Sequence, residues 1–265
     1  LPRKMLAREV AMIAKMGVKI HYGRQLGRDF SLKKLRDQGY EAVLLAVGAP
    51  TGSKMGLPGE DARGGRDGIE FLREYNTKGT VAVGRKVAVI GGGNVAVDVA
   101  RTAVRLGAES VTVLYRRTRE QMPAYEEEVE EALKEGVKFD FLVAPVEVVA
   151  AKGCAQGIRC SRMKLGAFDR SGRRRSEKGG EEFVLEADQI IPAIGQSLDT
   201  SAIMNGTAAK LSPNEFVWAD PASGQTSLEW LFAAGDSVTG PASVVEAISA
   251  GEKAAVGIDR FLTGE

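Results

Sequence analysis

The sequence has few of the residues that carry metal or thiol chemistry, with two cysteines and one histidine in 265 residues. Cys154 and Cys160 are separated by five residues, a spacing that fits neither a CxxC redox pair nor a zinc knuckle. We therefore expect reduced, buried thiols and no disulfide chemistry. His21 has no serine or cysteine motif near it, so we expect a structural role. These absences predict no metal site and no catalytic acid, base or nucleophile.

Long apolar runs and an excess of one charge are also missing. No apolar run approaches the roughly 20 residues that span a bilayer, and the first four residues lack the apolar stretch of a signal peptide. With 36 Lys+Arg and 35 Asp+Glu, the net charge is +1, so no global field favours nucleic acid or a membrane surface. We expect a cytoplasmic protein that binds neither. The chain begins without Met and with Pro2 at a helix start, which predicts a piece of a longer protein.

Hydrophobic periodicity and glycine positions predict alternating strands and helices, which is typical of an α/β fold. A polar segment at 169–180 is expected to be an exposed hairpin loop, and the glycine-rich stretch 49–65 is expected to connect domains. Strands are expected at 18–21, 42–47, 86–90, 111–115, 138–142, 146–151, 158–165, 183–185, 189–194 and 230–234. Helices are expected at 2–15, 31–36, 69–75, 94–106, 125–135 and 243–262.

A glycine-rich turn joins the strand 86–90 to the helix 94–106 and predicts a dinucleotide site. Gly91 would permit the tight turn, Gly93 would let a pyrophosphate approach the helix N-terminus, and Ala96 would let the helix lie close to the strand. The helix amides and partial positive charge would bind the phosphates. A strand on one side and a helix and second strand on the other favour a site over an ordinary turn. The expected site comprises Gly91, Gly92, Gly93, Asn94, Val95 and Ala96.

The end of the second strand predicts which nicotinamide nucleotide binds. An NAD site usually has an acidic residue there, whereas this chain has Arg116 and Arg117 after Tyr115. Guanidinium groups match a 2′-phosphate in charge and bidentate geometry, so NADPH is expected. The alternative is that these arginines form a solvated strand end. The arginines at 173–175 lack the strand context, so we expect a solvated segment there.

Four ordered motifs carry a resemblance to a known family: 91–98 (GGGNVAVD), 115–124 (YRRTREQMPA), 193–196 (AIGQ) and 232–242 (FAAGDSVTGPA). Together they resemble the small (beta) subunit of NADPH-dependent glutamate synthase and its relatives, including the flavin subunits of NADPH-ferredoxin oxidoreductases. The resemblance covers nearly the whole chain.

This resemblance implies an α/β protein with two dinucleotide-binding, Rossmann-like domains, the NADPH domain being inserted in an FAD domain. By analogy, 1–78 and 198–265 belong to the FAD domain and 79–197 to the NADPH domain. The FAD domain would be incomplete, because the family's N-terminal iron–sulfur segment and first FAD glycine motif do not occur in this sequence.

The resemblance also implies flavin contacts. Gly235 and Asp236 would lie at the flavin, with the Asp accepting a hydrogen bond from the ribityl chain, although a plain strand-ending turn is the alternative. The following segment, which includes Ala242, Ser243 and Val244, would meet the isoalloxazine ring. An apolar strand ends in Ala-x-Gly twice, and its glycines Gly48 and Gly195 are expected to mark one nucleotide site in each domain.

The function implied is that of a flavin-dependent oxidoreductase, which takes a hydride from NADPH onto FAD. Electrons would pass to iron–sulfur centres or to a partner subunit, either a large glutamate-synthase-type subunit or another electron acceptor. The alternative is a non-catalytic NADPH-binding module, or a truncated chain without flavin. A scaffold that has lost both ligands is a third possibility.

Overall fold

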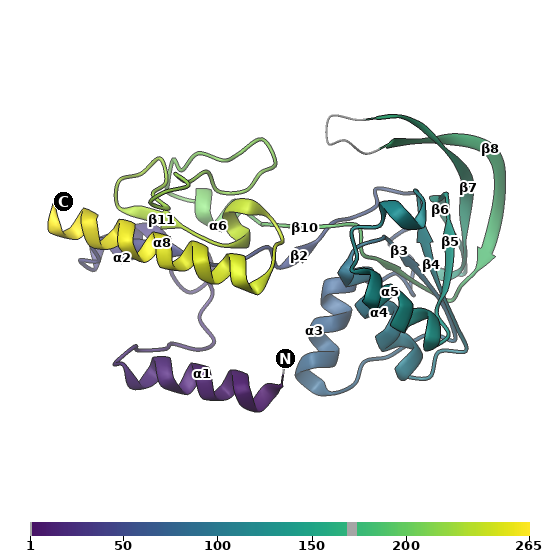
Figure 1. Ribbon diagram of the computed structural model, residues 1–265, viewed down its shortest axis with the longest axis horizontal. Coiled ribbons are helices and arrows are strands. Elements are labelled where there is room, and N and C mark those ends of the chain that lie inside the picture. The colour runs from purple at the N-terminus through teal and green to yellow at the C-terminus, as the bar shows by residue number, and fades with distance from the viewer. Residues whose placement is uncertain (1, 169–173) are drawn as a thin grey trace. The chain divides into compact units, whose positions relative to one another are not determined.

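The computed structural model describes residues 2–168 and 174–265 (Figure 1). The chain divides into two compact units, one formed by Ala49–Leu198 and the other by Leu1–Gly48 together with Asp199–Glu265. The resemblance groups 49–78 with the first segment, 1–78, of the expected FAD domain. In the structure these residues pack within the Ala49–Leu198 unit, because Phe71 of α3 (Gly68–Lys78) is completely buried in that unit's core.

The Ala49–Leu198 unit is built on a four-stranded parallel sheet in the order β5-β4-β3-β9. Alternate residues of a strand point to opposite faces, so Val87 and Val89 enter one apolar core while Ala88 and Ile90 enter another. The bounds are β3 (Lys86–Ile90), β4 (Ser110–Tyr115), β5 (Lys138–Phe141) and β9 (Gln189–Pro192).

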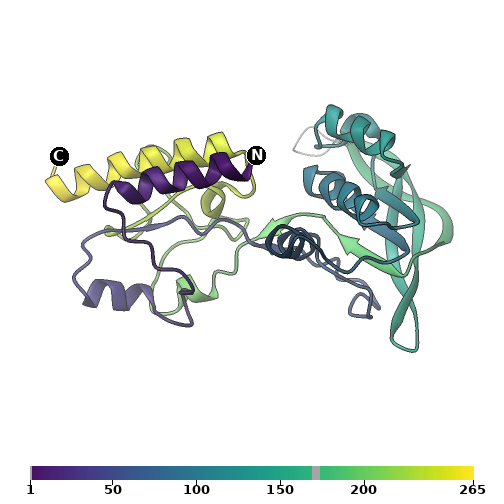
Figure 2. The same ribbon diagram turned by 90° about the horizontal axis from the view of Figure 1, so that it is seen from below.

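Different layers cover the two faces of this sheet (Figures 1 and 2). One face packs against α3, α4 (Asn94–Arg105) and α5 (Glu126–Lys134). The other packs against an antiparallel sheet of β6 (Val143–Ala151), β7 (Cys154–Phe168) and β8 (Arg174–Glu186). A short antiparallel pair, β2 (Thr51–Gly52) with β10 (Gln196–Ser197), completes the unit.

The expected hairpin loop at 169–180 is wrong for its second half. Residues from Arg174 onward are already strand β8, and Glu177 pairs with Lys164 of β7. Opposite charges on neighbouring strands stabilise such a polar ladder. Residues 169–173 of that expectation lie outside the described residues.

The strand expected at 18–21 is also wrong, since these residues form no strand. Val18 and Ile20 are 52% and 41% exposed, so their alternation faces solvent and not a sheet. A segment with alternating apolar residues forms a strand only where it can pair with a neighbouring strand.

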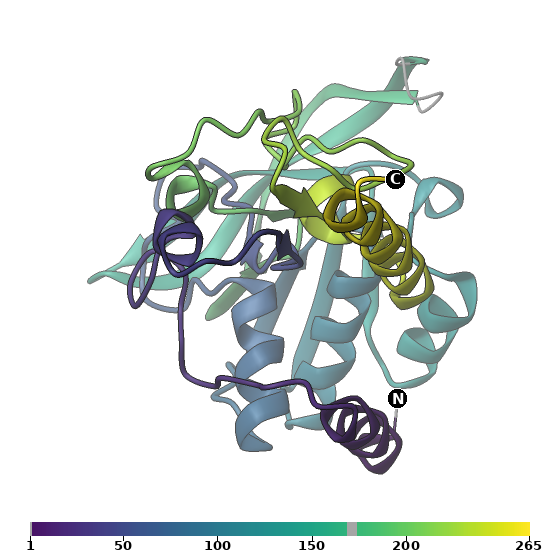
Figure 3. The ribbon, with the colours of Figure 1, turned by 90° about the vertical axis from the view of Figure 1, so that its left-hand side faces the viewer.

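The second unit contains a parallel pair, β1 (Val43–Leu45) with β11 (Leu231–Ala233). In Figure 3 the yellow helix α8 (Val244–Thr263) lies beside β11, where Phe261 contacts Phe232 edge to face. Three short helices, α2 (Leu32–Asp37), α6 (Ser201–Met204) and α7 (Asp236–Thr239), and the exposed α1 (Arg3–Lys15) complete it. In the part of the chain that the structure describes, no helix is long and apolar enough to cross a membrane.

Candidate nucleotide-binding site

Gly91 forms the tight turn that follows β3. Its φ of 146° lies in a region that side chains rarely adopt, and a Cβ added there would lie 2.2 Å from the carbonyl oxygen of Ala193. Its own N–H donates to the carbonyl oxygen of Leu114 at 3.1 Å. The turn is therefore pressed between the carboxyl ends of the two neighbouring strands, and only glycine fits.

Open space lies in front of α4. Gly93 is the N-cap residue of this helix and no side chain caps it, while the nearest atom to an added Cβ is Cγ of Pro123, 4.0 Å away. Ala96 is fully buried one turn later, which lets the helix lie against the sheet. Uncapped amides and the positive end of the helix dipole face this space, as a phosphate-binding turn requires.

The segment after β4 folds over the glycine turn. The ring of Tyr115 lies against Gly92, where an added Cβ would be 2.4 Å from it, and the Tyr115 hydroxyl donates to the carbonyl oxygen of Gln121 at 2.7 Å. The Ala124 N–H donates to the Gly92 carbonyl at 3.1 Å, and the Tyr125 N–H donates to Oδ1 of Asn94 at 3.0 Å. A short helix, η1 (Arg119–Gln121), lies within this segment. The motif 115–124 is recognisable in the sequence by resemblance, but its hydrogen bonds to the turn are a property of the fold that no local pattern signals.

The two arginines of the predicted 2′-phosphate site follow β4 directly. Because β3 and β4 are parallel, the ends that carry Gly91 and these arginines lie at the same edge of the sheet. Arg116 is exposed, whereas Arg117 is only 8% exposed and its Nε donates to the carbonyl oxygen of Arg174 at 2.9 Å. Thus Arg116 faces solvent, and Arg117 is held against the β7–β8 hairpin.

The two Ala-x-Gly strand ends lie in different units. Gly195 follows β9 with a φ of 146°, equal to that of Gly91, and its carbonyl accepts a hydrogen bond from the Ser53 N–H at 3.1 Å. It shares the strand-end edge with the glycine turn, since β9 is parallel to β3. Gly48 follows β1 in the other unit, with a φ of 69°.

Gly235 and Asp236 connect β11 to α7. Gly235 has a φ of 69°, and Oδ1 of Asp236 accepts a hydrogen bond from the Ala242 N–H at 3.2 Å. Ser243 then caps α8 in a capping box with Glu246. The carboxylate of Asp236 thereby closes a short loop, and the segment 242–244 comes to the start of the long helix.

The valines at the start of α8 are unusually exposed for apolar residues. Val244 and Val245 are 71% and 75% exposed. In this unit they form a small exposed apolar surface directly after the loop that Asp236 closes. Such a surface suits a flat apolar group or a covering segment.

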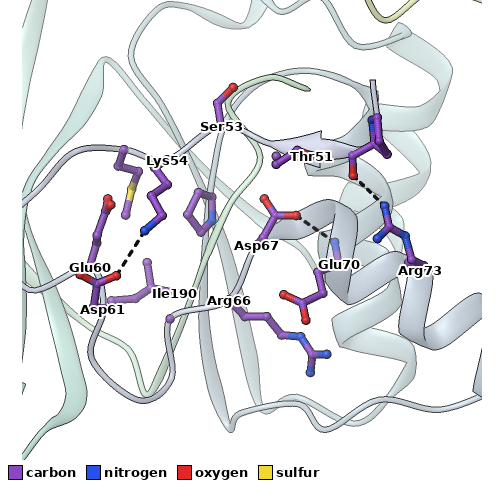
Figure 4. A pocket seen from close by; sticks show the side chains of 15 residues that line it. Thr51, Ser53, Lys54, Glu60, Asp61, Arg66, Asp67, Glu70, Arg73 and Ile190 are labelled. Atoms are coloured by element: carbon purple, nitrogen blue, oxygen red, sulfur yellow. Dashed lines mark hydrogen bonds and ion pairs between the residues drawn. The ribbon is translucent and has the colours of Figure 1, made fainter. Parts of the chain in front are cut away.

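A separate pocket of about 770 Å³ lies within the Ala49–Leu198 unit (Figure 4). No residue of the glycine turn lines it. Its cations are engaged: Lys54 pairs with Asp61 at 3.6 Å, Arg73 donates to the Pro50 carbonyl at 2.6 Å, and Arg66 pairs with Glu74. Because the amides at the start of α4 have no side-chain cap, the glycine turn and not this pocket is the candidate anion site.

A glycine turn at the end of a parallel strand, with a second parallel pair in another unit, is typical of α/β proteins that have two nucleotide-binding folds. The chain belongs to the pyridine nucleotide-disulphide oxidoreductase family, whose model matches residues 3–251. The fold class predicted from the sequence is confirmed, and the family to which the chain belongs is one of oxidoreductases. Cys154 and Cys160 are both free thiols in the structure.

Curated relatives match nearly the whole chain. It is 44% identical over 99% of its length to the NADP(+)-dependent formate dehydrogenase subunit beta of Moorella thermoacetica and covers 37% of that protein. It is 41% identical over 98% of its length to the NADPH-Fe(3+) oxidoreductase subunit beta of Geobacter sulfurreducens and covers 42% of it. It is 36% identical over 99% of its length to the glutamate synthase [NADPH] small chain of Escherichia coli and covers 59% of it. The predicted resemblance is confirmed, and the chain spans about half or less of the first two relatives.

Solved structures share the fold. FprA of Mycobacterium tuberculosis, solved in complex with NADPH, superimposes with a TM-score of 0.75 at 19% identity, over 91% of this chain and 67% of FprA. At this identity the likeness shows the arrangement of elements alone.

Proposed function

We propose that this chain is the NADPH-binding and flavin-reducing part of an NADPH-dependent oxidoreductase. The observation that carries the proposal is the open, uncapped N-terminus of α4 behind Gly91 and Gly93. A pyrophosphate there would accept hydrogen bonds from the first amides of the helix, at the positive end of its dipole. The brace from Ala124 and Tyr125 would keep the turn in shape before the nucleotide arrives.

Arg116 and Arg117 favour NADPH over NADH in this proposal. They supply two cations at the strand end where an NAD site would supply a carboxylate. Exposed Arg116 would approach the phosphate from solvent, and Arg117 would offer a guanidinium held by the hairpin. Gly195, at the same edge, would leave room for the nucleotide beside β9.

The flavin contacts proposed for the other unit are partial. Gly235, Asp236 and the segment 242–244 fit one side of a flavin site, since a glycine strand end, a carboxylate and a helix start lie together there. Gly48 would mark the opposite strand end. When bound, NADPH would supply a hydride and the flavin would accept it. No glycine motif for an FAD pyrophosphate precedes β3 in this sequence.

An electron-accepting subunit is the proposed partner. Two of the relatives are named beta subunits and one a small chain, which supports work within a multi-subunit enzyme. The large subunit of a glutamate-synthase-type enzyme is the finer form of this proposal. The proposed location is the cytoplasm, which two free cysteines support because thiols stay reduced there.

Nucleotide binding by the purified chain tests the proposal. The wild-type chain should bind NADPH more tightly than NADH in calorimetry. Arg116→Ala with Arg117→Ala should weaken NADPH binding about tenfold or more, since two charge-assisted contacts are lost, and leave NADH binding nearly unchanged. Equal weakening of both would refute the 2′-phosphate assignment.

Flavin content separates the proposal from the non-catalytic alternative. A flavin-reducing chain should be yellow, or become yellow on adding FAD, and should bleach with NADPH. A binding module would stay colourless in both cases while still binding NADPH. A scaffold would bind neither nucleotide.

A further inference from the structure

Arg174 lies next to the proposed 2′-phosphate site although it is 57 positions further along the chain than Arg117. It is the first residue of β8, and its carbonyl oxygen accepts the hydrogen bond from Nε of Arg117. The expectation that the arginines at 173–175 are only a solvated segment does not account for this contact.

The side chain of Arg174 fixes its own backbone. Its Nε donates to the carbonyl oxygen of Gly166 at 3.0 Å, and its Nη2 donates to that of Leu165 at 2.9 Å. Both carbonyls belong to β7, at the place where the β7–β8 pairing is irregular. The planar guanidinium therefore bridges the two strands where regular ladder bonds are interrupted.

The backbone of Arg117 is tied to the same hairpin. Its carbonyl oxygen accepts from the Leu142 N–H at 3.0 Å, and the Leu142 carbonyl accepts from the Met163 N–H of β7 at 2.7 Å. Main chain and side chain of Arg117 are thus both anchored to β7–β8. An anchored guanidinium loses less conformational freedom when a phosphate binds than a freely rotating one.

We propose that Arg174 is a positioning residue for recognition of a nucleotide 2′-phosphate, acting through Arg117. The inference rests on the proposed function. The fork from Arg174 to the β7 carbonyls holds the Arg174 carbonyl in place, and that carbonyl holds Nε of Arg117. The ligand class is a nucleotide with a phosphate on the adenosine 2′-oxygen, and Arg174 itself need not touch it.

Calorimetry with 2′,5′-ADP and with ADP measures this effect on the chain as it is, without flavin or turnover. Arg174→Met removes the fork and should raise the Kd for 2′,5′-ADP about two- to tenfold, the range expected for losing one hydrogen-bonded constraint, with the Kd for ADP unchanged. Arg175→Met is the matched control, because it removes the same charge from the exposed neighbour on β8 and should change neither Kd.

Two further variants separate positioning from charge and from folding. Arg174→Lys keeps the positive charge but cannot bridge two carbonyls with a planar guanidinium. It should therefore raise the Kd for 2′,5′-ADP nearly as much as Arg174→Met does. In an Arg117→Ala background, Arg174→Met should have no further effect on 2′,5′-ADP binding. Thermal unfolding checks that each variant is folded, and if Arg174→Met does not fold, Arg174→Lys alone decides.

Three results would overturn the inference. Arg174→Met could raise the Kd values for 2′,5′-ADP and ADP equally, Arg175→Met could raise the Kd for 2′,5′-ADP as much as Arg174→Met does, or Arg174→Met could keep its full effect in the Arg117→Ala background. If wild-type chain prefers 2′,5′-ADP and neither Arg174 variant changes that preference, only this inference fails. If wild-type chain shows no preference for 2′,5′-ADP, the NADPH proposal fails and this inference with it.

Discussion

Gly91 and Ala193 approach so closely that a Cβ on Gly91 would lie 2.2 Å from the Ala193 carbonyl oxygen, whereas a Cβ on Gly93 would meet no atom nearer than 4.0 Å. Gly91→Ala should therefore lower the unfolding temperature and the yield of folded protein, since backbone must move. Gly93→Ala should fold like the wild type and still lose NADPH binding by about tenfold or more, because its methyl group occupies the space in front of α4.

This pair of variants separates the structural glycine from the binding one. Circular dichroism melts and NADPH titration of both proteins supply the measurement. A Gly93→Ala protein that binds NADPH normally would contradict the placement of the pyrophosphate.

Tyr115 should contribute to binding by bracing the turn and not by contact with the nucleotide. Tyr115→Phe removes the hydroxyl that donates to the Gln121 carbonyl and leaves the ring against Gly92. We expect a loss of about 1 kcal/mol in the free energy of unfolding. NADPH and NADH binding should weaken by the same factor, because the brace acts on the pyrophosphate turn that both share.

Denaturant unfolding and titration with both nucleotides check this prediction. Tyr125→Phe is a suitable control, because Tyr125 is 62% exposed and donates to Asn94 through its backbone N–H, which the substitution keeps. A selective loss of NADPH binding in Tyr115→Phe would mean that Tyr115 acts on the 2′-phosphate side instead.

The helices and strands that could be predicted from the sequence are those whose apolar residues lie along one face or are nearly all buried. The strand 86–90 was predicted with the bounds that the structure gives it, because four of its five residues are buried and Gly91 ends it sharply. Helix α4 follows for the same reason, since its apolar residues recur along one face.

Polar strands and long-range contacts could not be predicted in this way. In β8 nearly every residue is exposed or half-buried, so no alternation distinguishes strand from loop. The contact between Arg117 and Arg174 depends on how β4, β7 and β8 are arranged, which no local pattern encodes. Similarly, the motif 115–124 is recognisable by resemblance, but its hydrogen bonds to the glycine turn depend on how the segment after β4 folds back.

Glu135 should contribute measurably to the loss of unfolding free energy that the protein shows as the pH falls. It accepts hydrogen bonds from Arg105 and Arg101 of α4, and the bond from Arg105 is the larger cause that lowers the pKa of Glu135 below its ordinary value of 4.5. A lowered folded-state pKa stabilises the protein above the unfolded pKa, and this contribution is lost as pH falls through the folded one.

Glu135→Gln should therefore unfold at a lower denaturant concentration than the wild type at pH 7. The difference between the two midpoint concentrations should shrink at acid pH and in high salt. Glu131→Gln is the control, because the ion pair that the described residues give Glu131 is with Lys134 of its own helix, and its side chain is 50% exposed. A difference that persists unchanged below the titration of Glu135 would show that the carboxylate charge is not responsible.

Cys160 should be inert in the folded chain, whereas Cys154 should react. Cys160 is completely buried in the core between the parallel and antiparallel sheets, and burial, with Asp140 nearby, raises the pKa of its thiol to about 12. At pH 8 the thiolate fraction would then be on the order of one in ten thousand, and alkylation requires thiolate. Cys154 is only half-buried.

Iodoacetamide at pH 8 should add one label to the native wild-type chain and two labels to the chain in denaturant. In the Cys154→Ala variant it should add no label to the native chain and one label in denaturant. Native labelling at Cys160, located by peptide mass spectrometry, would mean that the core between the two sheets opens on the timescale of the reaction.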